Sequence, residues 1–166
     1  MDSNKNGEAM KNFCRQDLIR IVDTFEDKPE ALNYMTHLLA DSGCLNFPDR
    51  FLAAVRGRED IMSTGIGKGI AIPHARDLTV NSLQMAVCLL RNPMDFSSID
   101  NLPVSLIFMI AAPQSSNQQY MQILRSLSEY LRDEDHRNNM INSENEIKLY
   151  EYICEIEDII ISNIVD

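Results

Sequence analysis

The chain has 166 residues, of which 45% are hydrophobic and 24% are charged, and its formal net charge at pH 7 is −10. A chain of this length can bury one substantial core and is too short for two comfortable domains. The acidic balance argues against a nucleic-acid-binding protein, because binding to a phosphate backbone requires clustered lysine and arginine.

Neither metal ligation nor membrane insertion is indicated by the residue pattern. The four cysteines are widely dispersed, without a Cys-x-x-Cys pair or a histidine at ligand spacing, so we expect no metal site, no cofactor and no disulfide framework. No stretch approaches the ~20 apolar residues that a membrane span needs. The N-terminal residues are polar and lack the apolar core of a signal peptide. The sequence therefore predicts a cytoplasmic protein with reduced thiols.

The beginning of the chain is predicted to pass from disorder into a helix. Residues 1–12 are rich in asparagine, lysine and serine, and we expect them to be disordered. Residues 18–25 fit a short strand or a short helix. Asp27, followed by Pro29 and Glu30, is typical of a helix start. The buried stripe of this helix is expected to comprise Leu32, Met35, Leu38 and Leu39.

A second helix is predicted to begin within residues 46–49 and to end at Gly57. Arg58 would then follow the C-terminus of that helix directly. A cation there is favourable for the helix dipole alone. A guanidinium also suits phosphate oxygens, which it binds in a bidentate manner. The neighbouring Glu59 either orients Arg58 or is solvated.

A glycine-rich stretch follows, with Gly65, Gly67 and Gly69 at alternate positions. Glycine adopts positive φ at no steric cost, so such a turn can direct successive backbone N–H groups at an anion. The stretch is not a P-loop, because Met62 stands at the first glycine position and Gly69 follows the lysine. It is therefore a glycine turn of another kind.

His74 closes this stretch. Residues 71–74 look like a short apolar strand that stops at Pro73, which would present His74 at a strand end. An imidazole has an ordinary pKa near ~6.5, so much of it is neutral at physiological pH and can attack a phosphoryl group. Arg58, Lys68 and Arg76 would supply positive charge nearby. A satisfied core histidine is the alternative, and the residues alone leave both open.

Two apolar runs, residues 83–90 and 104–112, are predicted to be central strands covered on both faces. Asn92-Pro93 and Asp100-Asn101 are predicted to form turns. With the helices on either side, the pattern favours an α/β fold: a single domain with a mixed central β-sheet flanked by helices on both faces.

Three helices are expected in the last third of the chain, over residues 117–132, over residues 134–141 and from Ser143 onward, where Ser143 and Glu146 have capping-box spacing. The buried stripe of the first comprises Tyr120, Leu124, Leu127 and Leu131.

The C-terminal end is apolar at helical spacing, although residues 159–161 fit a strand equally well. We expect this end to pack on the core, and self-association of the chain through it is the alternative. The apolar positions are Leu149, Ile153, Ile156, Ile160 and Ile164.

Several of these motifs together resemble a known family. They are Arg58-Glu59, the segment STGIG over residues 63–67, the segment GIAIPH over residues 69–74, and DNLPV over residues 100–104. They are similar to the type-2 enzyme IIA (EIIA) domain, of the fructose, mannitol and nitrogen-regulatory class, of the phosphotransferase system (PTS). The closest resemblance is to the stand-alone nitrogen-regulatory branch. It implies a domain over residues 13–153 and leaves an apolar tail over residues 154–166.

The resemblance implies that His74 accepts a phosphoryl group from an HPr-like phosphocarrier protein and that Arg58 stabilises it. Thr64 and the three glycines would form the phosphate loop. Sugar-carrying members usually show a second histidine where Tyr120 stands; a tyrosine hydroxyl can donate a hydrogen bond to phosphate but cannot share a proton near neutral pH. The chain would be a phosphocarrier or regulatory protein whose further partner is a sugar-specific EIIB or a regulatory target. The alternative is a non-catalytic interaction module of the same fold.

Overall fold

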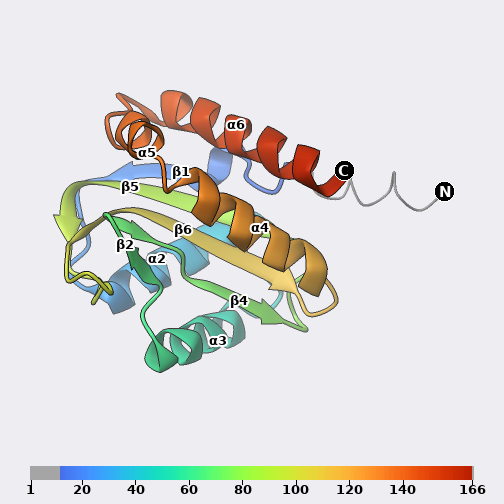
Figure 1. The fold of residues 1–166 in the computed structure, drawn as a ribbon. Coiled ribbons are helices and arrows are strands. Elements are labelled where there is room, and N and C mark those ends of the chain that lie inside the picture. Colours follow the sequence, from blue (N-terminus) through green and yellow to red (C-terminus); the bar gives the residue numbers. More distant parts are fainter. Residues whose placement is uncertain (1–11, 166) are drawn as a thin grey trace.

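A mixed β-sheet of six strands lies at the centre of the described chain (Figure 1). The computed structural model describes residues 12–165, without the side chains of residues 164 and 165. The strand order is β1-β5-β6-β3-β2, and β4 also pairs with β6. The strands are β1 (Ile19–Val22), β2 (Gly65–Gly67), β3 (Ile70–Ala71), β4 (His74–Asp77), β5 (Gln84–Met94) and β6 (Val104–Pro113).

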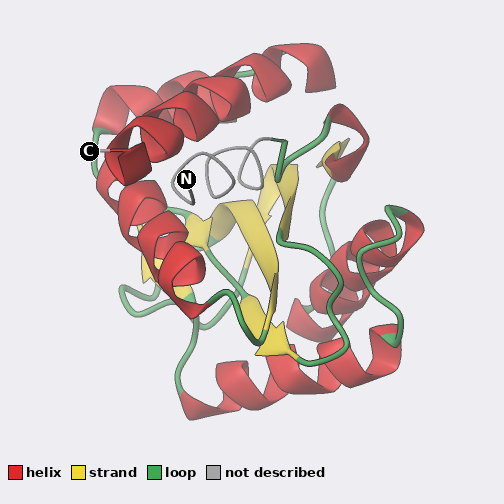
Figure 2. Ribbon diagram, turned by 90° about the vertical axis from the view of Figure 1, so that its right-hand side faces the viewer, coloured by secondary structure: helices red, strands yellow, loops and turns green. Residues whose placement is uncertain are grey.

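Helices cover both faces of this sheet, which confirms the predicted fold class (Figures 1 and 2). One face carries α2 and α3, and the other carries α4, α5 and α6. Their bounds are α2 (Lys28–Asp41), α3 (Pro48–Ile61), α4 (Asn117–Tyr130), α5 (Glu134–Ile141) and α6 (Glu146–Val165), after a short 3₁₀ turn, η1 (Gln16–Leu18). The predicted disordered segment lies, apart from residue 12, outside the described residues.

The two predicted central strands are β5 and β6, which pair antiparallel with Val87 opposite Phe108. Their buried residues run almost without interruption, because helices cover both sides. The predicted turn at Asn92-Pro93 is wrong: both residues belong to β5, which continues to Met94. The register of β5 and β6 shifts before Met94, and proline is tolerated at such an irregularity because no ladder hydrogen bond is lost there.

The first helix starts as predicted, since the Asp27 side chain accepts a hydrogen bond from the Glu30 N–H at 2.9 Å. The second does not end as predicted. Helix α3 continues through Gly57 to Ile61, so Arg58 lies in its last turn. A Cβ added to Gly57 would meet nothing within 4 Å. A glycine in a helix interior costs only about 1 kcal/mol, and the rest of α3 offsets it.

The C-terminal end is one continuous helix, α6, so the strand alternative for residues 159–161 is wrong. Ile153, Ile156 and Ile160 are buried against the chain's own core, which confirms the expected packing. Nothing in the described residues supports self-association through this end. The Ile164 side chain lies outside the description.

The predicted capping box at the start of α6 is also wrong. Asn145 Oδ1 accepts the Lys148 N–H at 2.9 Å, whereas the Ser143 hydroxyl donates to the Asn139 carbonyl at 3.2 Å. Glu146 instead accepts the N–H of Ile21 at 3.2 Å, so its carboxylate ties α6 to β1.

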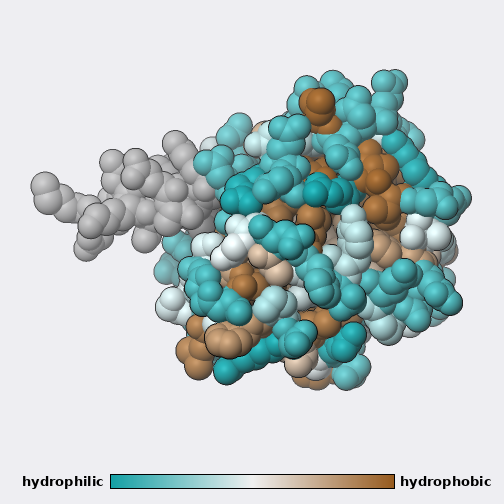
Figure 3. All heavy atoms as spheres, turned by 180° about the vertical axis from the view of Figure 1, so that it is seen from behind, coloured by the Kyte–Doolittle hydropathy of each residue, from teal (hydrophilic) through white to brown (hydrophobic). Residues whose placement is uncertain are grey.

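The surface seen from behind is largely hydrophilic, with apolar side chains in separate groups (Figure 3). None of the helices over residues 12–165 combines the length and the apolar composition that crossing a bilayer would require.

Candidate functional site

His74 stands at the junction of two short strands. Strand β3 ends at Ala71, and β4 begins at His74, which pairs with Ile110 of β6. The expected strand over residues 71–74 is therefore divided, because Pro73 has no N–H for the ladder. The Pro73 carbonyl still accepts the N–H of Ile110 at 3.0 Å. His74 is thus held by β6 and is half-buried.

The His74 ring has a defined polarity. Its Nδ1 lies 2.7 Å from the carbonyl oxygen of Ile72. A carbonyl only accepts, so Nδ1 must carry the proton, and the lone pair of the neutral ring is on Nε2. Burial lowers the pKa of His74; the hydrogen bond to Ile72 opposes this shift, and the charge of Arg58 adds to it. The ring is therefore neutral at physiological pH.

Tyr120 lies beside His74, and the charge of Arg58 reaches the imidazole. The ring centroids of His74 and Tyr120 are 5.6 Å apart, and the rings are tilted by 58°. Arg58 donates to the Met62 carbonyl at 2.7 Å from the last turn of α3, and its charge reaches both rings. Burial raises the pKa of Tyr120 to about 12, against the charges of Arg76 and Arg58. Tyr120 is therefore a neutral hydroxyl donor.

Arg76 is the residue that sequence reasoning did not single out. It was named only as one of three cations that would supply positive charge near His74, yet its guanidinium carbon lies 5.5 Å from the ring centroid of Tyr120. Arg76 is two positions after His74 in β4, and side chains two positions apart in a strand lie on the same face. That spacing was the signal available from the sequence.

Glu59 has a role that neither sequence-based alternative described. Its carboxylate is buried, accepts hydrogen bonds from the N–H and the hydroxyl of Thr64, and pairs with Lys28 Nζ at 3.1 Å. The Thr64 carbonyl in turn accepts the N–H of Ile72 at 3.0 Å. Glu59 therefore anchors the segment that precedes His74 and is neither solvated nor an orienting partner of Arg58.

The glycine turn is separate from His74. Gly67, Lys68 and Gly69 have positive φ, and the Lys68 N–H donates to the carboxylate of Asp100 at 2.8 Å. Gly69 bonds to Leu106 of β6, whereas His74 pairs with Ile110, four positions or about 13 Å further along that strand.

Of the predicted phosphate loop, Thr64 lies on the segment linked to His74, while Gly67 and Gly69 lie at the other end of the β2–β3 hairpin. Gly65 has no positive φ and packs against Ser98. The phosphate-binding role of the loop stays a prediction.

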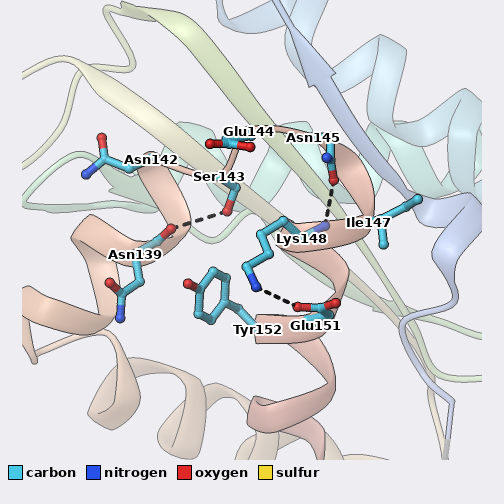
Figure 4. Close-up of a pocket in the computed structure, with 9 residues that line it drawn as sticks. All are labelled: Asn139, Asn142, Ser143, Glu144, Asn145, Ile147, Lys148, Glu151 and Tyr152. Atoms are coloured by element: carbon cyan, nitrogen blue, oxygen red, sulfur yellow. Dashed lines mark hydrogen bonds and ion pairs between the residues drawn. The ribbon is translucent and has the colours of Figure 1, made fainter.

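A separate surface hollow of about 430 Å³ lies where α5 meets α6 (Figure 4). Its lining includes Asn139, Asn142 and Tyr152, and the ion pair of Lys148 with Glu151 crosses it. None of the residues placed around His74 contributes to it. Over residues 12–165, no three histidine, cysteine or acidic side chains gather as a metal site would require.

These features define an α/β domain with one neutral imidazole, held at a strand junction between arginines and a tyrosine. The chain matches the family model described as phosphoenolpyruvate-dependent sugar phosphotransferase system, EIIA 2, over residues 12–156. It therefore belongs to the type-2 EIIA family, as the sequence motifs suggested.

Relatives carry two kinds of name. The chain is 31% identical over 140 residues to the fructose-specific EIIA component of Haloferax volcanii, covering 84% of this chain and 91% of that protein. It is also 31% identical over 159 residues to the nitrogen regulatory protein of Escherichia coli, covering 95% and 96%. The nitrogen regulatory protein IIA-Ntr of Neisseria meningitidis shares the fold, with a TM-score of 0.78, 24% identity and coverage of 90% and 99%.

Proposed function

We propose that the chain is a phosphocarrier that accepts a phosphoryl group on Nε2 of His74 from an HPr-like carrier protein. The observation that carries this proposal is the contact of Nδ1 with the Ile72 carbonyl, since it leaves the Nε2 lone pair free on a neutral ring. Membership of a phosphotransferase family supports the choice of a phosphoryl group as the electrophile.

In the proposed step, Nε2 attacks the phosphorus of the donor's phosphohistidine in line. The new N–P bond forms as the donor's N–P bond breaks, and the donor imidazole leaves with that electron pair. The proton stays on Nδ1 throughout, and Nδ1–H donates its hydrogen bond to the Ile72 carbonyl. Arg58 stabilises the equatorial oxygens, and Tyr120 donates a hydrogen bond to them.

We assign the phosphorylated chain a regulatory role rather than sugar delivery. Tyr120, with a pKa of about 12, cannot exchange a proton near neutral pH as a second histidine would. The mannitol IIA of Escherichia coli, which shares the fold at a TM-score of 0.73 and 20% identity, was solved in complex with phosphorylated IIB. A sugar-specific EIIB is therefore the further partner if the chain passes its phosphate on, and a regulatory target protein is the partner if it does not.

The test is incubation with phosphoenolpyruvate, enzyme I and an HPr-type carrier. We expect an acid-labile, alkali-stable phosphate that is lost in His74→Ala and retained in the control His37→Ala, because His37 is exposed on α2 and hydrogen-bonds only within its helix. Label that persists in His74→Ala would contradict the proposal.

The second candidate is a non-catalytic interaction module, and Tyr120 at the position of the second family histidine favours it. Two results together would support this candidate: the wild-type chain takes no label, and His74→Ala binds the partner protein with the same affinity as the wild type.

A further inference from the structure

One arginine lies over the ring of Tyr120, and the charge of a second reaches it from a different element. Arg76 reaches it from β4, with its guanidinium carbon 5.5 Å from the ring centroid. Arg58 acts on it from the end of α3. The ring centroid of His74 lies 5.6 Å from that of Tyr120, so Arg76, Tyr120 and His74 form one cluster.

The orientation of the Tyr120 ring is not fixed by a hydrogen bond from its hydroxyl to another described residue. Tyr120 comes from the first turn of α4 and is only 6% exposed. The position of the ring therefore depends on packing and on the guanidinium beside it. A cation over an aromatic face contributes about 0.5–2 kcal/mol, enough to favour one side-chain orientation.

Arg76 also polarises the hydroxyl. Its positive charge lowers the pKa of the hydroxyl, but burial outweighs this effect and raises the pKa to about 12, so the hydroxyl stays a neutral donor. A donor of this kind is suited to an anionic phosphoryl oxygen.

We propose that Arg76 is a positioning residue for phosphate recognition: lying over the ring of Tyr120, it holds the tyrosine hydroxyl toward the group bound at Nε2 of His74. Tyr120 and Arg76 then act as one unit. This inference rests on the proposed function, because it takes a phosphoryl group on His74 as the ligand, and it gives Arg76 a specific role beyond that of a nearby cation.

A double-mutant cycle tests whether the two residues act as one unit. The probe is inorganic phosphate, titrated into the unmodified full-length chain and followed through the imidazole C–H resonances of His74 by NMR. We expect Tyr120→Phe and Arg76→Gln each to weaken phosphate binding roughly tenfold, the factor for one charge-assisted hydrogen bond. The double variant should bind no more weakly than the weaker single variant.

Two further variants make the cycle specific. Arg76→Lys keeps the charge but loses the planar guanidinium over the Tyr120 ring. Its affinity for phosphate should therefore lie between those of Arg76→Gln and the wild type. Arg56→Gln removes an exposed arginine from α3 and should leave binding unchanged. Thermal unfolding of each variant identifies any loss of affinity that comes from unfolding.

Additive losses in the cycle would overturn the inference, because Arg76 would then bind phosphate independently of Tyr120. An unchanged affinity in Arg76→Gln, or a wild-type chain whose His74 resonances do not respond to phosphate, would also overturn it. A different result would overturn the proposed function. In that case the wild-type chain would take no label from the phosphocarrier, although the double-mutant cycle for phosphate binding is non-additive.

Discussion

At the scale of single residues, the surroundings of His74 favour a neutral ring, as the proposed attack on a phosphoryl group requires. The Ile72 carbonyl holds the proton on Nδ1, partial burial disfavours the charged ring, and Arg58 adds positive charge beside it. Burial and Arg58 therefore favour an unprotonated Nε2, whereas the hydrogen bond to Ile72 opposes the lowered pKa and decides that the neutral ring keeps its proton on Nδ1. The net charge of −10 does not cancel them, because charges further away than the Debye length of about 8 Å are largely screened at physiological ionic strength.

We predict that His74 titrates below its ordinary pKa of 6.5, as followed by NMR of the imidazole protons. Arg58→Gln removes a neighbouring positive charge, so the pKa of His74 should rise toward 6.5 in that variant. Arg56→Gln is the matched control, since it removes an exposed charge from the same helix. A pKa above 6.5 in the wild-type chain would refute the neutral-nucleophile argument.

At the scale of elements, the β2–β3 hairpin carries His74 into place. Its first strand packs tightly: a Cβ on Gly65 would lie 2.9 Å from the Cα of Ser98. Its base is anchored by the buried Glu59 carboxylate through Thr64. The three glycines are therefore not equivalent, since Gly65 is required for close packing and Gly67 and Gly69 for positive φ.

A pair of glycine substitutions separates close packing from helix propensity. Gly65→Ala should lower the free energy of unfolding by about 1–3 kcal/mol, because the backbone of Ser98 cannot move aside easily. Gly57→Ala, in the open interior of α3, should instead raise it by about 0.5–1 kcal/mol. Urea denaturation measures both, and equal effects would show that Gly65 is not in close contact.

Helix α6 contributes to the stability of the fold through its buried apolar side chains. Ile156→Ala should lower the free energy of unfolding by about 2–5 kcal/mol, the range for a large-to-small change in a core. Ile147→Ala, on an exposed position of the same helix, should change it by less than about 0.5 kcal/mol. If Ile156→Ala altered only the oligomeric state, α6 would be an interface and not part of the core.

At the scale of the whole molecule, the two ends of the described chain are joined. The Cys14 N–H donates to the Glu157 carboxylate of α6 at 2.8 Å, and Ile21 of β1 bonds to Glu146 at the start of the same helix. Strand β1 is the edge of the sheet beside β5, so these contacts cover it. Helix α6 runs through position 154, where we expected the domain to give way to a tail.

Glu157 should make the stability of the molecule depend on pH. Burial raises its pKa above 4.5, against the hydrogen bond from Cys14. A carboxyl whose pKa is raised by folding stabilises the fold fully at low pH, and this contribution is lost as the pH rises through the raised pKa. Glu157→Gln should therefore be more stable than the wild type at pH 7 and nearly equal at pH 4.

The measurement is chemical denaturation at both pH values, with the exposed Glu144→Gln as control. If Glu157→Gln were less stable than the wild type by the same amount at pH 4 and at pH 7, the buried carboxylate would be favourable in the fold.

The sequence by itself determined the elements that depend on local patterns. Periodicity and capping were sufficient for α2, α5, the two central strands and the fold class, because hydrophobic spacing and an Asp27 cap act within a few residues. The family motifs likewise singled out His74 and Arg58 as candidate site residues, and their role stays a prediction.

The tertiary structure decided the contacts between residues far apart in the chain, which local sequence patterns do not predict. Contacts with distant elements set Glu146 against β1 and buried Glu59 of α3 against Lys28 and Thr64. They also placed Arg76 over Tyr120 and Asp100 at the glycine turn. Such contacts join residues far apart in the chain, so their energies leave no periodic trace in the sequence.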